Sequence, residues 1–228
     1  MKINFLTLFP NYFKPFVEES IINKAQTKGL LDIKIIDFRQ FSNDKHNKVD
    51  DEIYGGGHGL LLKVEPIDLA LKSLEKNGGY KILVSPQGKK FDQQIANRLA
   101  KHEQITLISG RYEGFDERVV ELVDEEISIG DYVLTGGELP SMVIADAIAR
   151  LVPGVINQLS HENDSFQNEG LLDYPQYTRP RVYEGMSVPE VLFSGNHAKI
   201  EAWKKEAQYQ KTLKNRPDII ERIKQNEK

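Results

Sequence analysis

Residues 80–85 read Tyr80-Lys81-Ile82-Leu83-Val84-Ser85, a short and almost entirely apolar stretch that is followed by Pro86-Gln87-Gly88. A run of this length and character is typical of a strand buried on both faces within a parallel sheet. Parallel strands are joined by long crossover connections, usually helices. We therefore expect strands and helices to alternate on both sides of this stretch.

The expected alternation is present across the first 150 residues. Four further segments have the pattern of strands: residues 2–8, 31–38, 105–109 and 125–129. Five segments have the helical spacing of apolar residues: residues 13–28, 67–74, 92–101, 116–123 and 138–152. This alternation predicts the α/β class with a mainly parallel sheet. Residues 42–62 lack a convincing periodicity, which inside a compact domain is unusual unless the segment is functional.

The character of the sequence changes after Pro153-Gly154, where a polar and aperiodic segment begins. Two amphipathic stretches, His197–Leu213 and Asp218–Lys224, follow near the end of the chain. We therefore predict three parts: a larger domain of residues 1–156, a flexible linker of residues 157–172, and a small helical domain of residues 173–228.

The composition is that of an ordinary globular protein of 228 residues, with 39% hydrophobic and 28% charged residues. The absence of cysteine excludes a disulfide scaffold, an iron–sulfur cluster, a thiolate zinc site and a cysteine nucleophile. No apolar stretch approaches the ~18 residues of a membrane helix. The first ten residues lack the apolar run and cleavage site of a signal peptide, so we expect a cytoplasmic protein.

The charge is distributed unevenly. The whole chain has a net charge of −4, but residues 197–228 contain nine Lys and Arg against five Asp and Glu, which leaves −8 on the remainder. A basic segment on an acidic protein can bind a phosphate backbone. A solvated helix face has the same composition, so the charge alone leaves both interpretations open.

Three glycine-bearing loops follow three successive predicted strands. They are Ser85-Pro86-Gln87-Gly88, Gly110-Arg111-Tyr112-Glu113-Gly114, and the segment from Gly130 to Gly137. Glycine lets main chain approach a ligand closely, and ligands of open α/β sheets bind at the carboxyl ends of the strands. Any one of these loops is more simply a tight turn, but three together favour a ligand site.

The motifs that are missing restrict the kind of ligand. The sequence has no Gly-x-Gly-x-x-Gly after its first strand, no Gly-Lys-Ser/Thr phosphate loop and no Gly-x-Ser-x-Gly elbow. Its five histidines show no metal-ligand spacing. These absences favour a ligand held by main-chain groups and apolar side chains, and an adenosine-bearing cofactor fits that description.

Arg150, at the end of the predicted helix 138–152, and Asp164, in the predicted linker, form a candidate polar pair. An aspartate ordered against an arginine can act as a general base beside a cation. Spacing alone does not distinguish this pair from two surface residues.

Several motifs together resemble the bacterial tRNA (guanine-N1)-methyltransferases, which belong to the SPOUT class of knotted methyltransferases. Three of them carry most of the resemblance: Asp50-Asp51-Glu52-Ile53-Tyr54-Gly55-Gly56-Gly57-His58-Gly59, residues 110–119 and residues 128–140. Shorter matches continue in order: Arg150-Leu151-Val152-Pro153-Gly154, Asp164-Ser165-Phe166, Tyr177-Thr178-Arg179-Pro180 and Ser194-Gly195-Asn196-His197.

The resemblance implies an activity and an architecture. The reaction would be methyl transfer from S-adenosylmethionine to N1 of the guanosine immediately 3′ of the anticodon. The fold would be an α/β domain with a deep trefoil knot, joined by a linker to a helical tRNA-binding domain. The protein would be a homodimer with active sites at the subunit interface, and its partner would be the anticodon stem-loop of tRNA.

The resemblance also assigns roles to individual residues. Asp164 would be the general base at guanine N1, and Arg150 would stabilise the charge that develops on O6. The cofactor would be held by Pro86, Gly110, Arg111, Tyr112, Glu113, Gly114, Ile129, Gly130, Asp131, Tyr132, Val133, Leu134, Gly136, Gly137 and Pro140. The target nucleoside would be contacted by Asp50, Gly55, Gly56, Gly57, His58, Gly59 and Ser165. If Mg²⁺ takes part, its ligand would be Glu113.

Two alternatives remain at this point. A SPOUT-type methyltransferase with another target, such as ribosomal RNA, would keep the cofactor loops without needing the Asp164 and Arg150 pair. A catalytically inactive RNA-binding relative would bind the cofactor without turnover.

Overall fold

The computed structural model describes residues 1–157, 164–167 and 170–226. The chain divides into two compact units, Met1–Asn157 and Gln158–Lys228, and each is described by itself. Part of the predicted linker, residues 158–163 and 168–169, lies outside the described residues.

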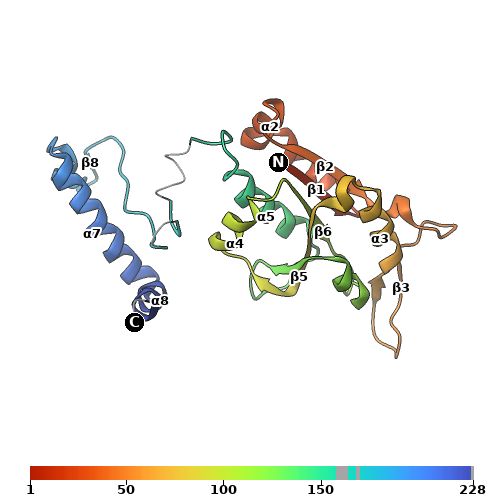
Figure 1. The fold of residues 1–228 in the computed structure, drawn as a ribbon. Coiled ribbons are helices and arrows are strands. Elements are labelled where there is room, and N and C mark those ends of the chain that lie inside the picture. Colours follow the sequence, from red (N-terminus) through yellow and green to blue (C-terminus); the bar gives the residue numbers. More distant parts are fainter. Residues whose placement is uncertain (158–163, 168–169, 227–228) are drawn as a thin grey trace. The chain divides into compact units, whose positions relative to one another are not determined.

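The first unit is built on a five-stranded parallel sheet with the order β2-β1-β6-β5-β7 (Figure 1). The strands are β1 Lys2–Thr7, β2 Asp32–Asp37, β5 Tyr80–Lys90, β6 Gln104–Ser109 and β7 Glu125–Ser128. The predicted α/β class with a parallel sheet is confirmed. The central strand β6 is buried at every residue, as its apolar sequence requires.

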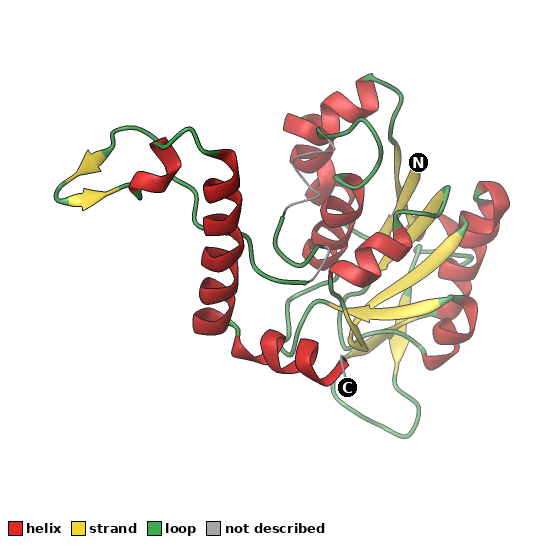
Figure 2. Ribbon diagram, turned by 60° about the vertical axis from the view of Figure 1, so that its left-hand side comes forward, coloured by secondary structure: helices red, strands yellow, loops and turns green. Residues whose placement is uncertain are grey.

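Helices cover both faces of the sheet, and Figure 2 shows the strands between them. One face packs against α1 Lys14–Glu18, α2 Ser20–Thr27, α4 Gln93–Leu99 and α5 Glu138–Ala149. The other face packs against α3 Val64–Ser73 and the 3₁₀ helix η4 Glu117–Leu122. Alternate residues of a strand serve the two cores: Phe5 belongs to the first and Leu6 to the second.

Three predicted elements differ from the structure. The predicted helix 116–123 is the 3₁₀ helix η4, which Asp116 caps by accepting a hydrogen bond from the N–H of Arg118. The predicted helix 13–28 is divided, because Glu19 is extended and Ser20 has φ +55°. Strand β5 continues past Pro86 to Lys90, and its pairing with β7 shifts register between Val84 and Lys89.

The segment 42–62, which lacks periodicity, contains an antiparallel hairpin. Its strands are β3 Asp50–Glu52 and β4 Leu60–Leu62, and the loop between them extends away from the sheet (Figure 1). Strands of three residues are too short to show an alternation in the sequence.

The second unit contains the hairpin of β8 Val182–Tyr183 and β9 Met186–Ser187, and the helices α7 His197–Asn215 and α8 Pro217–Asn226. Its core consists of Leu171, Ile219 and Ile220, with Tyr209 and Ile223 packed against them. Among the described residues, no helix has the length and apolar character needed to cross a membrane.

Candidate functional site

A pocket of about 270 Å³ lies at the ends of β6 and β7 and beside the middle of β5, where the pairing of β5 with β7 shifts register. Its walls come from three segments: the middle of β5 around Pro86, residues 110–117 after β6, and residues 128–137 at and after the end of β7, with Pro140 of α5. Every residue predicted to hold the cofactor lines this pocket except Asp131. The exposed side chain of Asp131 instead lies 3.6 Å from Nζ of Lys90.

Sequence reasoning missed part of the lining. The pocket is also bounded by Leu83, Val84, Ser85, Gln87, Phe115, Asp116, Glu117, Val120, Glu126, Ser128 and Thr135. Most of these residues end a strand or lie next to the glycine motifs. Their position at the carboxyl ends of the strands is the signal that would have included them.

Main chain forms one wall of the pocket at Gly137. The N–H of Gly137 donates to the carbonyl of Gly110 at 2.9 Å. A Cβ atom built on Gly137 would lie 2.7 Å from the nitrogen of Gly110, and one built on Gly110 would lie 2.6 Å from the ring of Phe115. Gly137 therefore requires glycine for this close approach, whereas a side chain at Gly110 would have to displace the ring of Phe115.

Beside this wall, the side chain of Arg111 is mostly buried. Its Nη2 lies 2.9 Å from Oε2 of Glu138, and its Nη1 donates to the carbonyl of Thr135 at 3.1 Å. Its guanidinium carbon lies 4.4 Å from the centre of the Phe9 ring and 5.1 Å from that of Tyr12. Burial by itself lowers the pKa of Arg111, but its interactions with Tyr12 and Glu138 raise the pKa above its ordinary value.

The hairpin β3–β4 is joined to the pocket by main-chain hydrogen bonds. The N–H of Leu62 donates to Gly114, the N–H of Glu113 donates to Leu60, and the N–H of Asp116 donates to Leu62. Gly59 also lies against Glu113, because a Cβ atom there would be 2.5 Å from Cγ of Glu113. The structure therefore brings the predicted target-binding loop next to the predicted cofactor loop.

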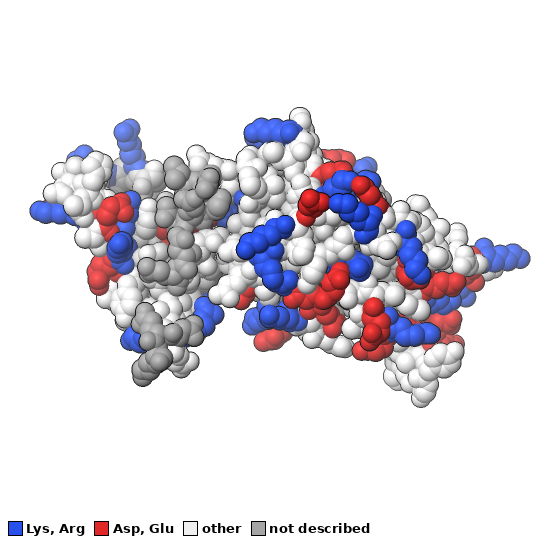
Figure 3. Space-filling view, in the orientation of Figure 1, with Lys and Arg blue, Asp and Glu red and all other residues white. Residues whose placement is uncertain are grey.

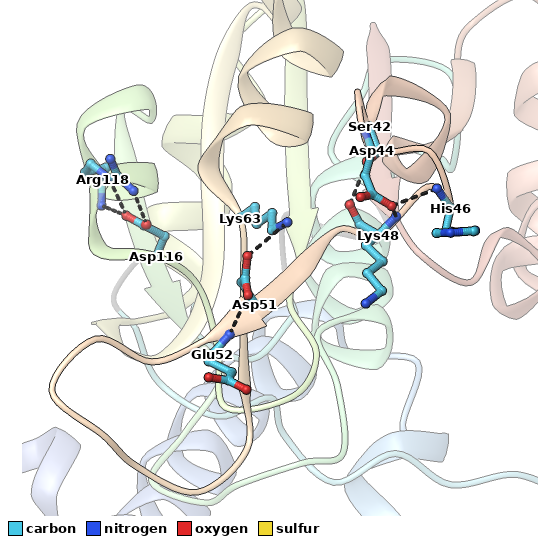
Figure 4. Close-up of polar contacts among 9 residues, drawn as sticks. All are labelled: Ser42, Asp44, His46, Lys48, Asp51, Glu52, Lys63, Asp116 and Arg118. Carbon is cyan, nitrogen blue, oxygen red and sulfur yellow. Dashed lines mark hydrogen bonds and ion pairs between the residues drawn. The ribbon is translucent and has the colours of Figure 1, made fainter.

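Ion pairs hold the base of this hairpin. Figure 4 shows the Asp51 carboxylate pointing toward the ammonium group of Lys63, 3.1 Å away. The hydrogen bond from the Glu52 N–H and the charge of Lys63 lower the pKa of Asp51. On the neighbouring loop Arg118 makes a forked contact with Asp116, which lowers the pKa of that carboxyl.

A turn precedes the hairpin. Asp44 accepts hydrogen bonds from the main-chain N–H groups of Lys48 and His46, and these bonds lower its pKa (Figure 4). The turn therefore orders the chain immediately before β3.

The loop of the hairpin itself is exposed. Gly55, Gly56 and Gly59 have φ between +83° and +85°, and the side chain of Tyr54 is 99% exposed. Gly57 and His58 are exposed as well, whereas Asp50 is partly buried where it pairs with Leu62.

The described residues contain no group of three or more His, Asp or Glu side chains able to hold a metal ion. Glu113, the predicted magnesium ligand, is exposed on the pocket loop and packs against Gly59. A magnesium ion at Glu113 would therefore draw few of its ligands from these side chains.

The two predicted catalytic residues belong to different units. Arg150 is partly buried at the end of α5, and its N–H donates to the carbonyl of Asp146 at 3.2 Å. Asp164 is partly buried in the second unit, where its carbonyl accepts from the N–H of Gln167. The neighbouring Ser165, predicted to contact the target, accepts a hydrogen bond from the N–H of Asp173 through its Oγ.

Lysines are frequent on α7. Lys205 and Lys214 are exposed, while Lys204 pairs with Glu201 at 2.7 Å and lies 5.2 Å from the centre of the Tyr174 ring. Figure 3 shows blue side chains interspersed with fewer red ones on this unit. Such a surface is suited to contact with phosphate groups.

Comparison with known proteins identifies the family. Residues 1–222 match the family described as "tRNA (Guanine-1)-methyltransferase TrmD". The chain is 75% identical to the tRNA (guanine-N(1)-)-methyltransferase of Mycoplasmopsis synoviae, with all of both chains covered. It is 74% identical to that of Mycoplasmopsis agalactiae over 98% of each chain, and 54% identical to that of Staphylococcus carnosus over 96% of this chain and 91% of the relative. These matches confirm the resemblance seen in the motifs, and the chain therefore belongs to the tRNA (guanine-1)-methyltransferase family and is a methyltransferase.

Proposed function

We propose that this protein transfers a methyl group from S-adenosylmethionine to N1 of the guanosine immediately 3′ of the anticodon in tRNA. The observation that carries the proposal is the pocket between the ends of β6 and β7 and the middle of β5, in a chain that matches its family over residues 1–222. We also propose that the protein acts in the cytoplasm.

The residues of the pocket fit an adenosine-bearing cofactor. Gly110 and Gly137 carry no side chain, which leaves room for a base against the main chain of this wall. Ile129, Leu134 and Pro140 add apolar surface for the base and the ribose. When bound, the cofactor supplies an electrophilic methyl group on a positively charged sulfur, which requires alignment rather than activation.

The guanine supplies the nucleophile only after N1 has lost its proton, so the reaction requires a base. We assign that role to Asp164, whose carboxylate accepts the N1 proton. We assign to Arg150 the stabilisation of the negative charge that grows on O6 as the proton leaves. Ser165, Asp50 and residues 55–59 would hold the target nucleoside, and Glu113 would bind Mg²⁺ if the ion takes part.

The proposal includes the trefoil knot and the homodimer of the SPOUT class. The knot rests on the resemblance of residues 110–119 and 128–140 to the SPOUT class. The exposure of Leu139 and Val143 supports the dimer, since α5 is apolar on nearly all sides and half of each of these side chains remains exposed. The active sites would then lie at the subunit interface.

We further propose that residues 173–228 form the tRNA-binding domain and residues 157–172 the linker that joins it to the methyltransferase domain. The lysines of α7 support this assignment because phosphate contacts position a protein on RNA without reading its sequence.

The proposal is tested by methyl transfer from labelled S-adenosylmethionine to a tRNA that carries guanosine 3′ of its anticodon. The control is the same tRNA with adenosine at that position, and mass spectrometry locates the product. We expect N1-methylguanosine in the first tRNA only. Methylation of ribosomal RNA instead, or cofactor binding without any turnover, would overturn the proposed target or the proposed activity respectively.

A further inference from the structure

The carboxylate of Glu138 is almost completely buried. Glu138 begins α5 and is 1% exposed, with its side chain between the end of β1 and the loop that follows β6. Its Oε1 accepts a hydrogen bond from Oγ1 of Thr7 at 2.9 Å, and its Oε2 lies 2.9 Å from Nη2 of Arg111. The side chain of Glu138 thus contacts two segments, one more than 100 residues away in the sequence and the other more than 20 residues away.

Stability alone does not explain a charged pair at this position. The free energy lost when a carboxylate and a guanidinium leave water offsets much of their mutual attraction. A protein with well-packed apolar residues of similar volume in place of such a pair is often at least as stable. The start of a helix does favour a negative charge. However, the two oxygens of Glu138 contact two different segments, Thr7 through a hydrogen bond and Arg111 through an ion pair, and this points to a role in geometry.

Arg111 connects Glu138 to the wall of the pocket. Its Nη1 holds the carbonyl of Thr135, and Phe9 and Tyr12 lie beside the guanidinium. Gly136 packs directly on the pair, because a Cβ atom there would lie 2.4 Å from Nε of Arg111 and 2.6 Å from Oε2 of Glu138. The pair therefore supports the pocket wall at residues 135–137, together with the hydrogen bond from Gly137 to Gly110.

We propose that Glu138 is a positioning residue for methyl transfer: its carboxylate fixes Arg111, and through Arg111 it fixes the 135–137 wall of the cofactor pocket. This inference rests on the proposed function, because it takes the pocket to be the S-adenosylmethionine site. It predicts that Glu138 acts on the binding of the cofactor and leaves the chemistry at guanine N1 unchanged.

The test compares Glu138→Gln with Glu125→Gln. Glutamine retains the size of the side chain and an acceptor for Thr7 but removes the charge that holds Arg111. Glu125 is the matched control, because it too is a carboxylate paired with an arginine, Arg98, although it is less buried than Glu138 and does not line the pocket. The readouts are the Kd of S-adenosylhomocysteine by calorimetry, KM for S-adenosylmethionine, kcat at saturation, and Tm.

We expect Glu138→Gln to raise Kd and KM together by about tenfold, equivalent to about 1.4 kcal/mol, with kcat at saturation retained. Glu125→Gln should leave Kd and KM unchanged even if its Tm falls. Arg111→Lys should weaken binding as well, and combining it with Glu138→Gln should add little, since residues of one network are not additive. A fall in kcat with unchanged Kd, a fall in Tm alone, or full additivity would overturn the inference.

Thr7 provides a second route if Glu138→Gln does not fold. Thr7→Val keeps the shape of the side chain and removes its hydrogen bond to Glu138, together with the one that it accepts from the N–H of Phe9. It should therefore raise Kd in the same direction, whereas Thr7→Ser, which keeps both bonds, should retain the wild-type value. Equal Kd values for both Thr7 variants would contradict the inference.

Wild-type protein that binds S-adenosylhomocysteine but methylates no tRNA would refute the proposed function, while the calorimetric comparison would still decide the role of Glu138. Wild-type protein that binds no S-adenosylhomocysteine would overturn both.

Discussion

At the scale of single residues, glycines determine the shape of the pocket, because they have no side chain to fill it. Gly137 is buried, and the nearest atoms to a Cβ built on it belong to the main chain of Ser109 and Gly110. A side chain can rotate away from a new methyl group, but main chain in the middle of a parallel sheet cannot. Substitution at Gly137 must therefore displace the segment 135–137 or the loop after β6.

We expect Gly137→Val to weaken the binding of S-adenosylhomocysteine by at least roughly tenfold, because overpacking of this kind costs about 1–3 kcal/mol. Calorimetry and a thermal melt measure the two effects. Gly185→Ala is the control, since a Cβ atom at Gly185 meets nothing within 4 Å and only its positive φ opposes the change. Unchanged affinity in Gly137→Val would mean that the cofactor binds elsewhere.

Asp164 is expected to act on the chemical step alone. Asp164→Ala should lower the single-turnover rate of methyl transfer by about 10²–10⁴-fold, the usual contribution of a general base, while the Kd of S-adenosylhomocysteine stays the same. Asp173→Asn is a suitable control in the same unit, because Asp173 accepts a hydrogen bond from its own neighbour, Tyr174. A rate in Asp164→Ala close to that of the wild type would remove Asp164 from the mechanism.

At the scale of elements, the hairpin β3–β4 presents an exposed aromatic ring in its loop. Its strands are tied to the loop 113–116, whereas Tyr54 at its far end is almost fully exposed. Exposed aromatic rings are common platforms for unpaired bases in RNA-binding proteins. Tyr54 is thus the most direct probe of whether this hairpin contacts the tRNA.

We expect Tyr54→Ala to raise KM for tRNA by roughly fivefold to a hundredfold, the range that corresponds to the stacking energy of one base. Tyr54→Phe should behave as the wild type, because it keeps the ring and loses only the hydroxyl group. Steady-state kinetics at saturating S-adenosylmethionine measure both. If the two variants are equally impaired, the hydroxyl group rather than stacking is responsible, and if neither is impaired the hairpin does not stack on RNA.

The elements also show what a sequence can and cannot predict. The apolar runs of β5 and β6 predicted the parallel sheet, because burial on both faces leaves a direct mark on composition. The helix predicted at 116–123 was wrong in type, since the side chain of Asp116 caps a 3₁₀ turn that apolar spacing does not distinguish from an α-helix. The extension of β5 depends on a register shift against β7, which is a tertiary feature.

The same distinction applies to the candidate site. The glycines after β6 and β7 were visible because close approach restricts residue type, and they line the pocket together, whereas Gly88 lies within β5 and does not line it. The contact of Thr7 with Glu138 was not visible, because nothing in either local sequence indicates the partner. The roles of Asp164 and Arg150 rest on family resemblance, and no spacing rule would have paired them.

For the whole molecule, α5 makes the proposed dimer testable. We expect the wild-type protein to sediment as a dimer and Val143→Glu to sediment as a monomer with little methyl transfer, because a charge would be buried at the interface without a partner. Val182→Glu, an equally drastic change on exposed strand β8, should leave the dimer intact. A dimeric Val143→Glu variant would exclude this face of α5 from the interface.

The basic C-terminal unit should determine how salt affects tRNA binding. Changing Lys204, Lys205 and Lys211 together to Gln should weaken tRNA binding. The slope of log Kd against log salt concentration should fall by an amount that corresponds to the loss of up to about three phosphate contacts. The control is the same change at Lys24, Lys28 and Lys101, exposed lysines of the first unit. Fluorescence anisotropy at several salt concentrations measures the slope, and an unaltered slope would place the RNA surface elsewhere.

The glycine walls of the pocket also have a consequence for drug resistance. An inhibitor usually loses potency when the target exchanges a side chain in its binding site, but amide and carbonyl groups are the same in every residue. At Gly110, Gly136 and Gly137 even one added carbon collides with neighbouring atoms, so the protein has few substitutions available there. A compound that packs closely against the main chain of these three positions would therefore meet few resistance substitutions.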